Sequence, residues 1–284
     1  MPVFYDTHAH LDYDDYQPDF AEVLARAQAA GITKIISIAT DLDSSRRALA
    51  LAEKHAMIYA AVGWHPSNAH EAPDDIRPAL RELARHPKAV AIGECGLDYY
   101  RLPSSGGSGD APVAVQGSDA TGRRIHLDDV RYKQKQAEVF RQQLEIAVET
   151  GLNCVIHQRS SFDDIVTQIQ PFAAKTRGVF HCFGESVERL QTILALGWLV
   201  SYTGIVTFKN GQNIRDAVAA TPMGKFMLET DCPYLAPVPY RGKRCEPAHV
   251  KEISASVAQA KLCSLDELSA ATCRAAHEFF PKLR

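Results

Sequence analysis

Short apolar or β-branched runs alternate with amphipathic segments along almost the whole chain, and this alternation limits the folds that it can adopt. The predicted strands are Val3–Thr7, Thr33–Ala39, Ile58–Gly63, Ala89–Gly93, Asn153–His157, Gly178–His181, Trp198–Tyr202 and Lys225–Glu229. Helical patterns lie near residues 18–30, 43–55, 74–86, 131–150, 160–174, 186–196, 211–220, 247–260 and 265–280. Strands that alternate with helices through short connections are typical of parallel sheets with right-handed crossovers.

Eight strand–helix repeats in roughly 250 residues favour a closed (β/α)₈ barrel over an open doubly wound sheet. No glycine-rich phosphate-binding motif follows the first predicted strand, which is further evidence against the open sheet. We therefore expect residues 1–284 to form a single α/β domain, a TIM barrel whose active site lies at the carboxyl ends of the strands.

One stretch, at about 102–129, interrupts the alternation. It is rich in glycine and serine, as in the run from Ser104 to Gly109, and it has no clear periodicity. We expect a flexible βα loop on the catalytic face. Such a loop could act as a lid or contact the substrate, or it could be a tolerated insertion without a chemical role.

Composition and charge exclude some classes of protein. The net charge is −3 and the pI is about 6.4, which argues against a uniformly basic surface for nucleic acid but leaves a local basic cluster possible. The chain starts without a leader-like segment and has no apolar run of about 18 residues, so we expect a cytoplasmic protein with no membrane partner. The oligomeric state has no signal in the sequence, and a monomer is the default expectation. Seven cysteines without a C-x-x-C pair suggest reduced thiols.

Histidine and carboxylate side chains recur at the carboxyl ends of the predicted strands. The six residues in question are His8, His10, Glu94, His157, His181 and Asp231. His8 and His10 are two positions apart, so in an extended chain their imidazoles project to the same side and can reach one ion. In a barrel, all six side chains would converge on the axis.

A single histidine at the end of an apolar run is usually a hydrogen-bonded core or rim residue. Six nitrogen and oxygen donors on one rim are better explained by a catalytic metal centre. We predict that these six residues form a divalent-metal centre.

Several motifs, in this order along the chain, resemble those of the TatD-type metal-dependent deoxyribonucleases of the amidohydrolase superfamily. They are Asp6-Thr7-His8-Ala9-His10-Leu11-Asp12, Gly63-Trp64-His65-Pro66, Gly93-Glu94-Cys95-Gly96-Leu97-Asp98-Tyr99-Tyr100, Ile156-His157-Gln158-Arg159, His181-Cys182-Phe183, Glu229-Thr230-Asp231-Cys232-Pro233-Tyr234-Leu235 and Arg241-Gly242-Lys243-Arg244.

The resemblance implies a metal-dependent hydrolase that cleaves phosphodiester bonds with metal-activated water, as a deoxyribonuclease of the 3′–5′ exonuclease kind. It further implies one or two divalent ions: one held by His8, His10 and Asp231, a second held by His157 and His181, and Glu94 as the bridge between them. Mg²⁺ or Mn²⁺ would suit phosphate chemistry, and a histidine-rich set would equally accept Zn²⁺. Glu94 and Asp231 are then the catalytic carboxylates. Asp231 could be the general base, or it could serve only as a ligand.

Five residues are candidates for binding DNA or another phosphodiester substrate: His65, Arg159, Arg241, Lys243 and Arg244. His65 could donate a hydrogen bond to a phosphate oxygen, or it could be a hydrogen-bonded turn histidine before Pro66. Arg159 could bind phosphate or pair with a carboxylate of the rim. The three cations at positions 241–244 could contact the nucleic-acid backbone or form a solvated turn.

The sequence leaves other functions open. The same centre could hydrolyse a small phosphodiester, an amide or a lactone, because ligand sets are shared across substrates in related barrels. The chain could also be a non-catalytic barrel that binds metal and an acidic partner. The complete set of histidines and carboxylates favours an enzyme.

Overall fold

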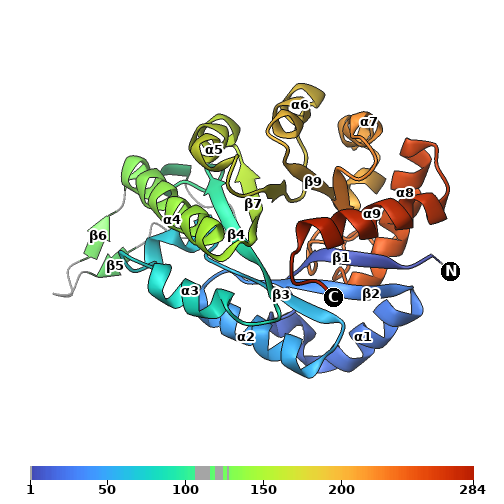
Figure 1. Cartoon of the computed structure of the whole chain (residues 1–284), viewed down its shortest axis with the longest axis horizontal. Helices are drawn as coiled ribbons and strands as arrows, with labels where there is room; N and C mark the ends of the chain where they lie inside the picture. Colours follow the sequence, from blue (N-terminus) through green and yellow to red (C-terminus); the bar gives the residue numbers. More distant parts are fainter. Residues whose placement is uncertain (1, 106–115, 119–123, 127) are drawn as a thin grey trace.

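The computed structural model describes residues 2–105, 116–118, 124–126 and 128–284 (Figure 1). Its main sheet has eight strands in the order β1-β2-β3-β4-β7-β8-β9-β10, and every strand pair with a described register is parallel. The strands are β1 (Phe4–Ala9), β2 (Ile32–Ile38), β3 (Ile58–Val62), β4 (Ala89–Asp98), β7 (Asn153–Arg159), β8 (Gly178–Phe180), β9 (Leu199–Tyr202) and β10 (Phe226–Leu228).

The two edge strands of this sheet meet, so the sheet closes into a barrel. Ala9 forms a parallel bridge with Cys232, beyond the end of β10. The amide of Asp231 donates to the carbonyl of His8 at 2.9 Å, and the amide of His10 donates to the carbonyl of Cys232 at 2.8 Å. The predicted (β/α)₈ barrel is thus confirmed.

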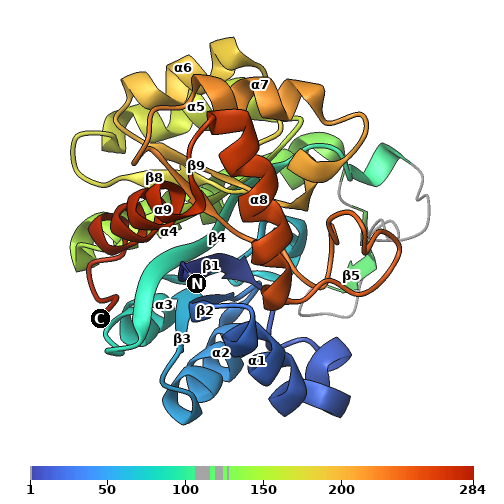
Figure 2. The same cartoon turned by 90° about the vertical axis from the view of Figure 1, so that its right-hand side faces the viewer.

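Helices cover the outside of the barrel. They are α1 (Phe20–Ala29), α2 (Leu42–Lys54), α3 (Arg77–Ala84), α4 (Asp129–Thr150), α5 (Phe162–Ile169), α6 (Val187–Ala195), α7 (Gln212–Ala220), α8 (Val250–Lys261) and α9 (Leu265–Phe279). Figures 1 and 2 show α1 to α3 on one side of the strands and α5 to α7 on the opposite side. None of the helices in the described parts of the chain combines the length and the apolar character needed to cross a bilayer.

Two apolar layers result from the alternation of side chains along the strands. The larger one packs the strands against the surrounding helices. The second contains residues such as Ile36, Val155 and Met227, which face the barrel axis, and it includes Phe279 and Phe280 at the end of α9. His157 lies two positions after Val155, on the same side of β7, so the strand that builds this inner layer also directs the imidazole towards the axis.

The observed elements differ from the predicted ones mainly at their ends. β4 extends to Asp98 and β7 to Arg159, because the two strands stay paired as far as these residues. The helix predicted at 18–30 begins as a 3₁₀ turn that contains Pro18, and the helix predicted at 160–174 ends in a 3₁₀ turn that contains Pro171. Proline lacks the amide hydrogen that an α-helix interior needs.

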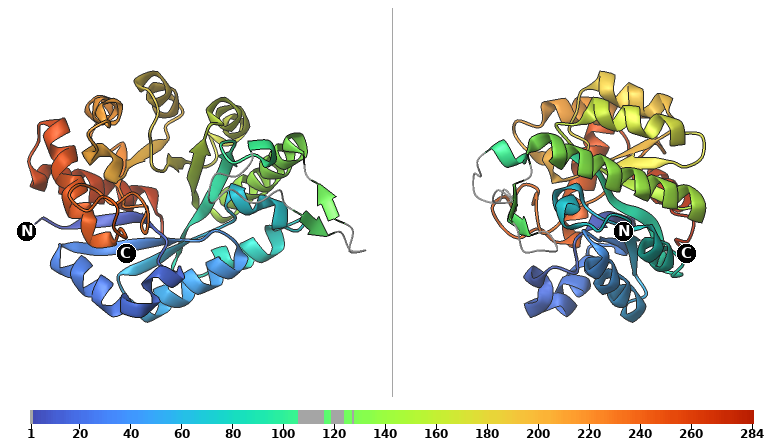
Figure 3. Two further views of the ribbon diagram at one scale, coloured as in Figure 1. Left: turned by 180° about the vertical axis from the view of Figure 1, so that it is seen from behind. Right: turned by 90° about the vertical axis from the view of Figure 1, so that its left-hand side faces the viewer.

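The Gly/Ser-rich stretch predicted at 102–129 lies mostly outside the described residues, so its role stays a prediction. The described part contains a 3₁₀ turn at Pro103–Ser105 and an antiparallel pair, β5 (Gln116–Ser118) and β6 (Arg124–His126). In Figure 3 this pair lies beside the barrel, near α4.

Candidate metal centre

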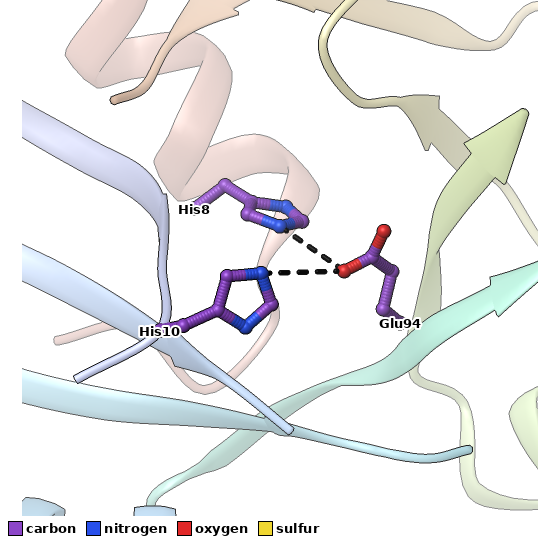
Figure 4. A group of neighbouring side chains, drawn as sticks. All are labelled: His8, His10 and Glu94. Carbon is purple, nitrogen blue, oxygen red and sulfur yellow. Dashed lines mark ion pairs between the residues drawn. The ribbon is translucent and has the colours of Figure 1, made fainter. Parts of the chain in front are cut away.

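The six residues predicted as metal ligands all lie at the carboxyl ends of the barrel strands. His8 is in β1, Glu94 in β4 and His157 in β7. His10 and His181 directly follow β1 and β8, and Asp231 lies three positions beyond the end of β10. The six side chains form one cluster, and Figure 4 shows His8 and His10 pointing towards Glu94 from the opposite side of the barrel mouth.

Glu94 is at the centre of this cluster, and its two oxygens face different imidazoles. Oε2 lies 3.2 Å from Nε2 of His8 and 3.6 Å from Nε2 of His10. Oε1 lies 2.7 Å from Nδ1 of His157 and 2.8 Å from Nε2 of His181. The side chain is only 2% exposed, so its charge is almost fully removed from water. A carboxylate placed between two pairs of nitrogen donors can bridge two neighbouring cations.

Two glycines explain why Glu94 can come this close to β7. Gly93 and Gly96 have φ angles of 154° and 140°, which L side chains rarely adopt. A Cβ atom at Gly96 would collide with the carbonyl oxygen of His157, and one at Gly93 would lie only 2.8 Å from that of Val155. The glycines of the Gly-Glu-Cys-Gly motif thus permit the close approach of β4 to β7.

Asp231 completes the half of the cluster formed by His8 and His10. Its Oδ1 lies 3.5 Å from Nε2 of each of these histidines. Asp231 has a φ of 58°, in the left-handed region that aspartate tolerates better than most residues. Its side chain is 15% exposed, compared with 2% for Glu94, so Asp231 is the carboxylate of the cluster that water can reach.

Hydrogen bonds behind the cluster orient two of the imidazoles. Nδ1 of His10 lies 3.1 Å from the carbonyl oxygen of Ile38, which can only accept, so Nδ1 carries the hydrogen and Nε2 presents its lone pair to the cluster. Nε2 of His157 faces Oδ2 of Asp98 at 3.3 Å in the same way. Carboxylates and carbonyls behind histidine ligands are typical of metal sites.

Some buried nitrogens of the cluster have no hydrogen-bond partner among the described residues. They are both ring nitrogens of His8 and Nδ1 of His181. A buried polar atom without a partner costs free energy. Nε2 of His8 nevertheless points into a space bordered by the carboxylates of Glu94 and Asp231, so the donor set fits a divalent cation.

The ionisation of the cluster agrees with metal binding. Burial would raise the pKa of Glu94, but the imidazoles of His181, His65 and His8 hold it well below its usual value. The pKa of Asp231 is also lowered, because a hydrogen bond from His10 and the charges of the neighbouring imidazoles together outweigh the effect of burial. Burial lowers the pKa of His8, which favours the neutral imidazole. Ionised carboxylates and a neutral imidazole are the forms that bind metal.

The opposite pKa shift occurs at His181. Burial alone would lower its pKa, but the carboxylates of Glu94 and Glu229 raise it well above the ordinary value. The negative charge of the cluster therefore attracts both protons and metal ions, and the two compete for the same nitrogen and oxygen atoms.

Two buried carboxylates of the site were not predicted from the sequence. Glu229 is 1% exposed, and its Oε1 accepts from the amide of Cys182 at 2.6 Å and lies 3.6 Å from Nδ1 of His181. Asp98 is 2% exposed and faces His157. Both residues follow apolar positions within the motifs quoted above, and this placement is the sequence feature that could have identified them as site residues. A buried acid at a strand end needs a partner.

His65 lies closer to the cluster than a substrate-binding role alone would require. Its Nε2 is 3.1 Å from Nδ1 of His157 and 3.5 Å from Oε1 of Glu94. Nδ1 accepts a hydrogen bond from the amide of Ser67 at 3.1 Å, so in the neutral ring Nε2 carries the hydrogen. Burial lowers the pKa of His65 and favours that neutral form. His65 therefore presents a donor to the site, although its position would also allow metal binding.

The four cations predicted to bind substrate lie outside the cluster. Arg159 stacks on the ring of Tyr100 at 3.8 Å, and Arg241 stacks on Phe208 at 3.8 Å. Lys243 is exposed. Arg244 donates to Oδ2 of Asp19 at 2.8 Å, so part of its hydrogen-bonding capacity is used within the protein.

Comparisons with known proteins agree with the geometry. The family model described as TatD related DNase matches residues 5–281. The uncharacterized metal-dependent hydrolase YabD of Bacillus subtilis is 34% identical over 279 residues, which cover 98% of this chain and 99% of YabD. The 3′-5′ ssDNA/RNA exonuclease TatD of Enterobacter lignolyticus is 32% identical over 260 residues, 89% of this chain and 90% of that protein.

Solved structures show the same fold. The crystal structure of YJJV, a TatD homologue from Escherichia coli, has a TM-score of 0.83 and 26% identity, and the match covers 98% of each chain. A phosphotriesterase homology protein from Escherichia coli has a TM-score of 0.65 and 12% identity, with 98% of this chain and 99% of that chain covered. The second likeness concerns the fold alone.

Proposed function

Because this chain belongs to the TatD-related DNase family of metal-dependent hydrolases, we propose that it is a deoxyribonuclease that removes nucleotides from DNA ends in the 3′–5′ direction. The observation that carries the proposal is the position of Glu94. One buried carboxylate separates two sets of imidazoles, an arrangement suited to the two-ion chemistry of phosphodiester cleavage.

In this proposal Glu94 belongs to both ion positions. His8, His10 and Asp231 would hold one divalent ion, and His157 and His181 would hold the other. Ions bound there would supply Lewis-acid activation of water and neutralise charge on the phosphoryl group. Asp98 lies within hydrogen-bond distance of His157, and Glu229 lies within ion-pair distance of His181, so both are positioning residues.

The protein's own proton transfers would involve two residues. Asp231 is ionised and partly exposed, so its carboxylate can accept the proton of the attacking water. Nε2–H of His65 can donate to an oxygen of the phosphoryl group, because Nδ1 is already engaged with Ser67. If Asp231 serves only as a ligand, its loss will lower metal content and turnover together.

The substrate assignment rests on the family and on cations at the mouth of the barrel. Arg159, Arg241 and Lys243 are exposed at the ends of β7 and in the loop after β10, where they would contact backbone phosphates. One relative carries the name 3′-5′ ssDNA/RNA exonuclease. A binding barrel without activity would have little use for such a complete donor set.

Metal removal followed by substrate comparison tests the proposal. Protein stripped of metal, as verified by elemental analysis, would be assayed with Mg²⁺, Mn²⁺ or Zn²⁺ on linear single-stranded DNA, circular single-stranded DNA, methyl p-nitrophenyl phosphate and a p-nitroanilide. We expect metal-dependent cleavage of the linear strand from its 3′ end and no cleavage of the circle.

A matched pair of histidine variants provides the control. His157→Ala should lower metal content and activity, whereas His86→Ala, which removes a surface histidine paired with Glu53, should lower neither. Activity in verified metal-free protein would refute the metal mechanism. Cleavage of the anilide or the small diester without cleavage of DNA would refute the nuclease assignment.

A further inference from the structure

Aromatic rings border the metal centre where β1 and β10 meet. The ring of Tyr13 stacks on the imidazole of His10, with 4.9 Å between centroids and 18° between planes. Tyr234 meets both rings edge-on, at 6.4 Å from His10 and 6.5 Å from Tyr13. Tyr234 is 55% exposed although it is a large aromatic residue. We call Tyr13 and Tyr234 the first platform.

A second flat surface lies at the ends of β4 and β7. Tyr100 is 58% exposed, and the guanidinium of Arg159 lies 3.8 Å from the centre of its ring. The amide of Tyr100 donates to Oδ1 of Asp98 at 2.9 Å, and Asp98 in turn faces His157. We call Tyr100 and Arg159 the second platform. The backbone of Tyr100 is joined to His157 of the metal centre through the buried carboxylate of Asp98.

The strand order places the two platforms on opposite sides of the barrel mouth. The first lies at the seam between β10 and β1, and the second lies at the seam between β4 and β7. These seams are half a turn apart in an eight-stranded barrel. Glu94, which meets imidazoles from both sides, lies between them.

Packing against His10 explains the partial burial of Tyr13, but no such packing explains the exposure of the other two tyrosines. Tyr13 covers the outer face of His10 and so helps to hold that ring. Tyr100 and Tyr234 each leave more than half of their surface in water next to a metal centre, at a cost in hydrophobic free energy. Exposed aromatic rings beside cationic groups are typical stacking surfaces for unpaired nucleobases.

We propose that each platform stacks one nucleobase, so that the two bases flanking the scissile phosphate are held on opposite sides of the metal centre. This inference rests on the proposed nuclease function. Neighbouring bases of a duplex stack on each other, so two of them can lie on opposite sides of the metal centre only after leaving that stack; the site therefore selects strands whose last bases are unpaired. The bases are recognised by their flat faces, and little sequence preference is expected.

Abasic substrates provide the test. The substrates would be a short oligothymidylate and two copies of it that carry a tetrahydrofuran residue at the last or at the next-to-last position. Tyr234→Ala and Tyr100→Ala should each lower kcat/KM on the intact strand about tenfold, the loss expected for one stacked base. Each penalty should vanish when the base that the missing ring contacts is also absent, and the two variants should respond to opposite positions.

Further variants separate stacking from other effects. Tyr234→Phe and Tyr100→Phe should restore most of kcat/KM, because they keep the ring, whereas the leucine variants should not. Tyr5→Ala removes a tyrosine at the start of β1, at the other end of the barrel, and should show the same small effect on all three substrates. Metal content and melting temperature would be measured for every variant.

The outcomes are distinct. Penalties that persist unchanged on both abasic strands, or that vanish at the same position for both variants, would overturn the two-platform arrangement. Rescue by leucine as well as by phenylalanine would overturn stacking. If the wild-type protein hydrolyses no oligonucleotide under any metal condition, the proposed function itself fails, before the platforms are tested.

Discussion

At the residue scale, the chemistry of this centre depends on how one carboxylate is shared. Oε1 of Glu94 faces His157 and His181, and Oε2 faces His8 and His10, so each oxygen belongs to a different set of donors. A histidine on either side serves one set only. Substitution of the shared residue should therefore have consequences different from those of substitution of its neighbours.

Glu94→Gln should lower kcat more than His157→Ala or His181→Ala does, by on the order of a hundredfold or more, and should reduce the number of ions bound per chain. The amide removes the negative charge that offsets repulsion between two cations, and it replaces one oxygen donor with NH₂. Metal stoichiometry and turnover would be measured together.

Glu229→Gln is the matched control for this prediction. Glu229 lies behind His181 rather than between the ions, so its substitution should cost only about tenfold in turnover or metal affinity. If Glu94→Gln retained full metal occupancy and full rate, the bridging role would be wrong.

At the element scale, the strands and helices were largely predictable, but some of their polar contacts were not. Periodicity identified all eight strands of the barrel, and the motifs identified the six clustered residues. Asp98 and Glu229 were missed as site residues because their burial depends on closure of the barrel, which brings together strands far apart in the sequence. The ion pair between Arg244 and Asp19 spans 225 positions and has no local signal.

Helix α4 shows a further feature that periodicity does not reveal. Three of its buried glutamines each use the side-chain amide to make a pair of hydrogen bonds to backbone groups of other elements. Gln143 accepts from the amide of Trp64 at 2.7 Å and donates to its carbonyl at 2.9 Å. Gln136 pairs with both backbone groups of Asp98 in the same way, at 2.9 and 3.0 Å. Gln142 joins the amide of Ile76 to the carbonyl of Asp74.

Gln143→Leu should destabilise the protein by about 1–3 kcal/mol per backbone group left unpaired, and it should also lower kcat. The second effect follows because Trp64 directly precedes His65, so loss of the pairing loosens the histidine that presents Nε2–H to the site. Denaturant unfolding would measure the first effect, and steady-state kinetics under fully folded conditions would measure the second.

The neighbouring Gln142→Leu separates these two effects. It should destabilise by a similar amount, but it should leave kcat near the wild-type value, because Ile76 and Asp74 lie away from the cluster. Equal losses of kcat in the two variants would show that turnover responds to any disturbance of α4, and not to the pairing of Gln143 with Trp64.

Asp19 connects the start of α1 to the loop after β10, and this contact should make stability depend on pH. Hydrogen bonds from Arg244 and Arg26 lower the pKa of Asp19 to about 2, from an ordinary value of 3.8. A lowered folded-state pKa means that the stabilisation is fully present above pH 3.8 and is lost as the pH falls towards about 2. Asp19→Asn should remove this component of the acid dependence of unfolding.

Denaturant unfolding of the wild type and the variant across this pH range would give the difference directly. Glu22→Gln is the comparison on the same helix, since Glu22 is exposed and forms no ion pair with any residue that the structure describes. An acid profile of Asp19→Asn that parallels the wild type would show that the contact contributes nothing to stability.

At the scale of the whole molecule, a mildly acidic protein must attract a polyanion through local charges. The net charge is −3, and the metal centre itself contains buried carboxylates. Arg241 and Lys243 are exposed in the loop after β10, two positions apart. Arg244, in the same loop, is already engaged with Asp19. The first two are therefore the cations that we expect to contact phosphates.

Replacement of Arg241 and Lys243 by glutamine should raise KM for single-stranded DNA with less effect on kcat. Phosphates remote from the scissile bond are bound equally in the ground and transition states, so removal of their cationic partners weakens binding without slowing the chemical step. The slope of log kcat/KM against log salt concentration should also become less steep, by about 0.7 for each phosphate of a single strand that the protein no longer neutralises.

Arg244→Gln removes a charge of the same sign from the same loop, and it should change stability more than the salt slope. If the double variant kept the wild-type KM and slope, DNA would have to enter over another part of the barrel mouth, and Arg159 at the end of β7 would be the next cation to test.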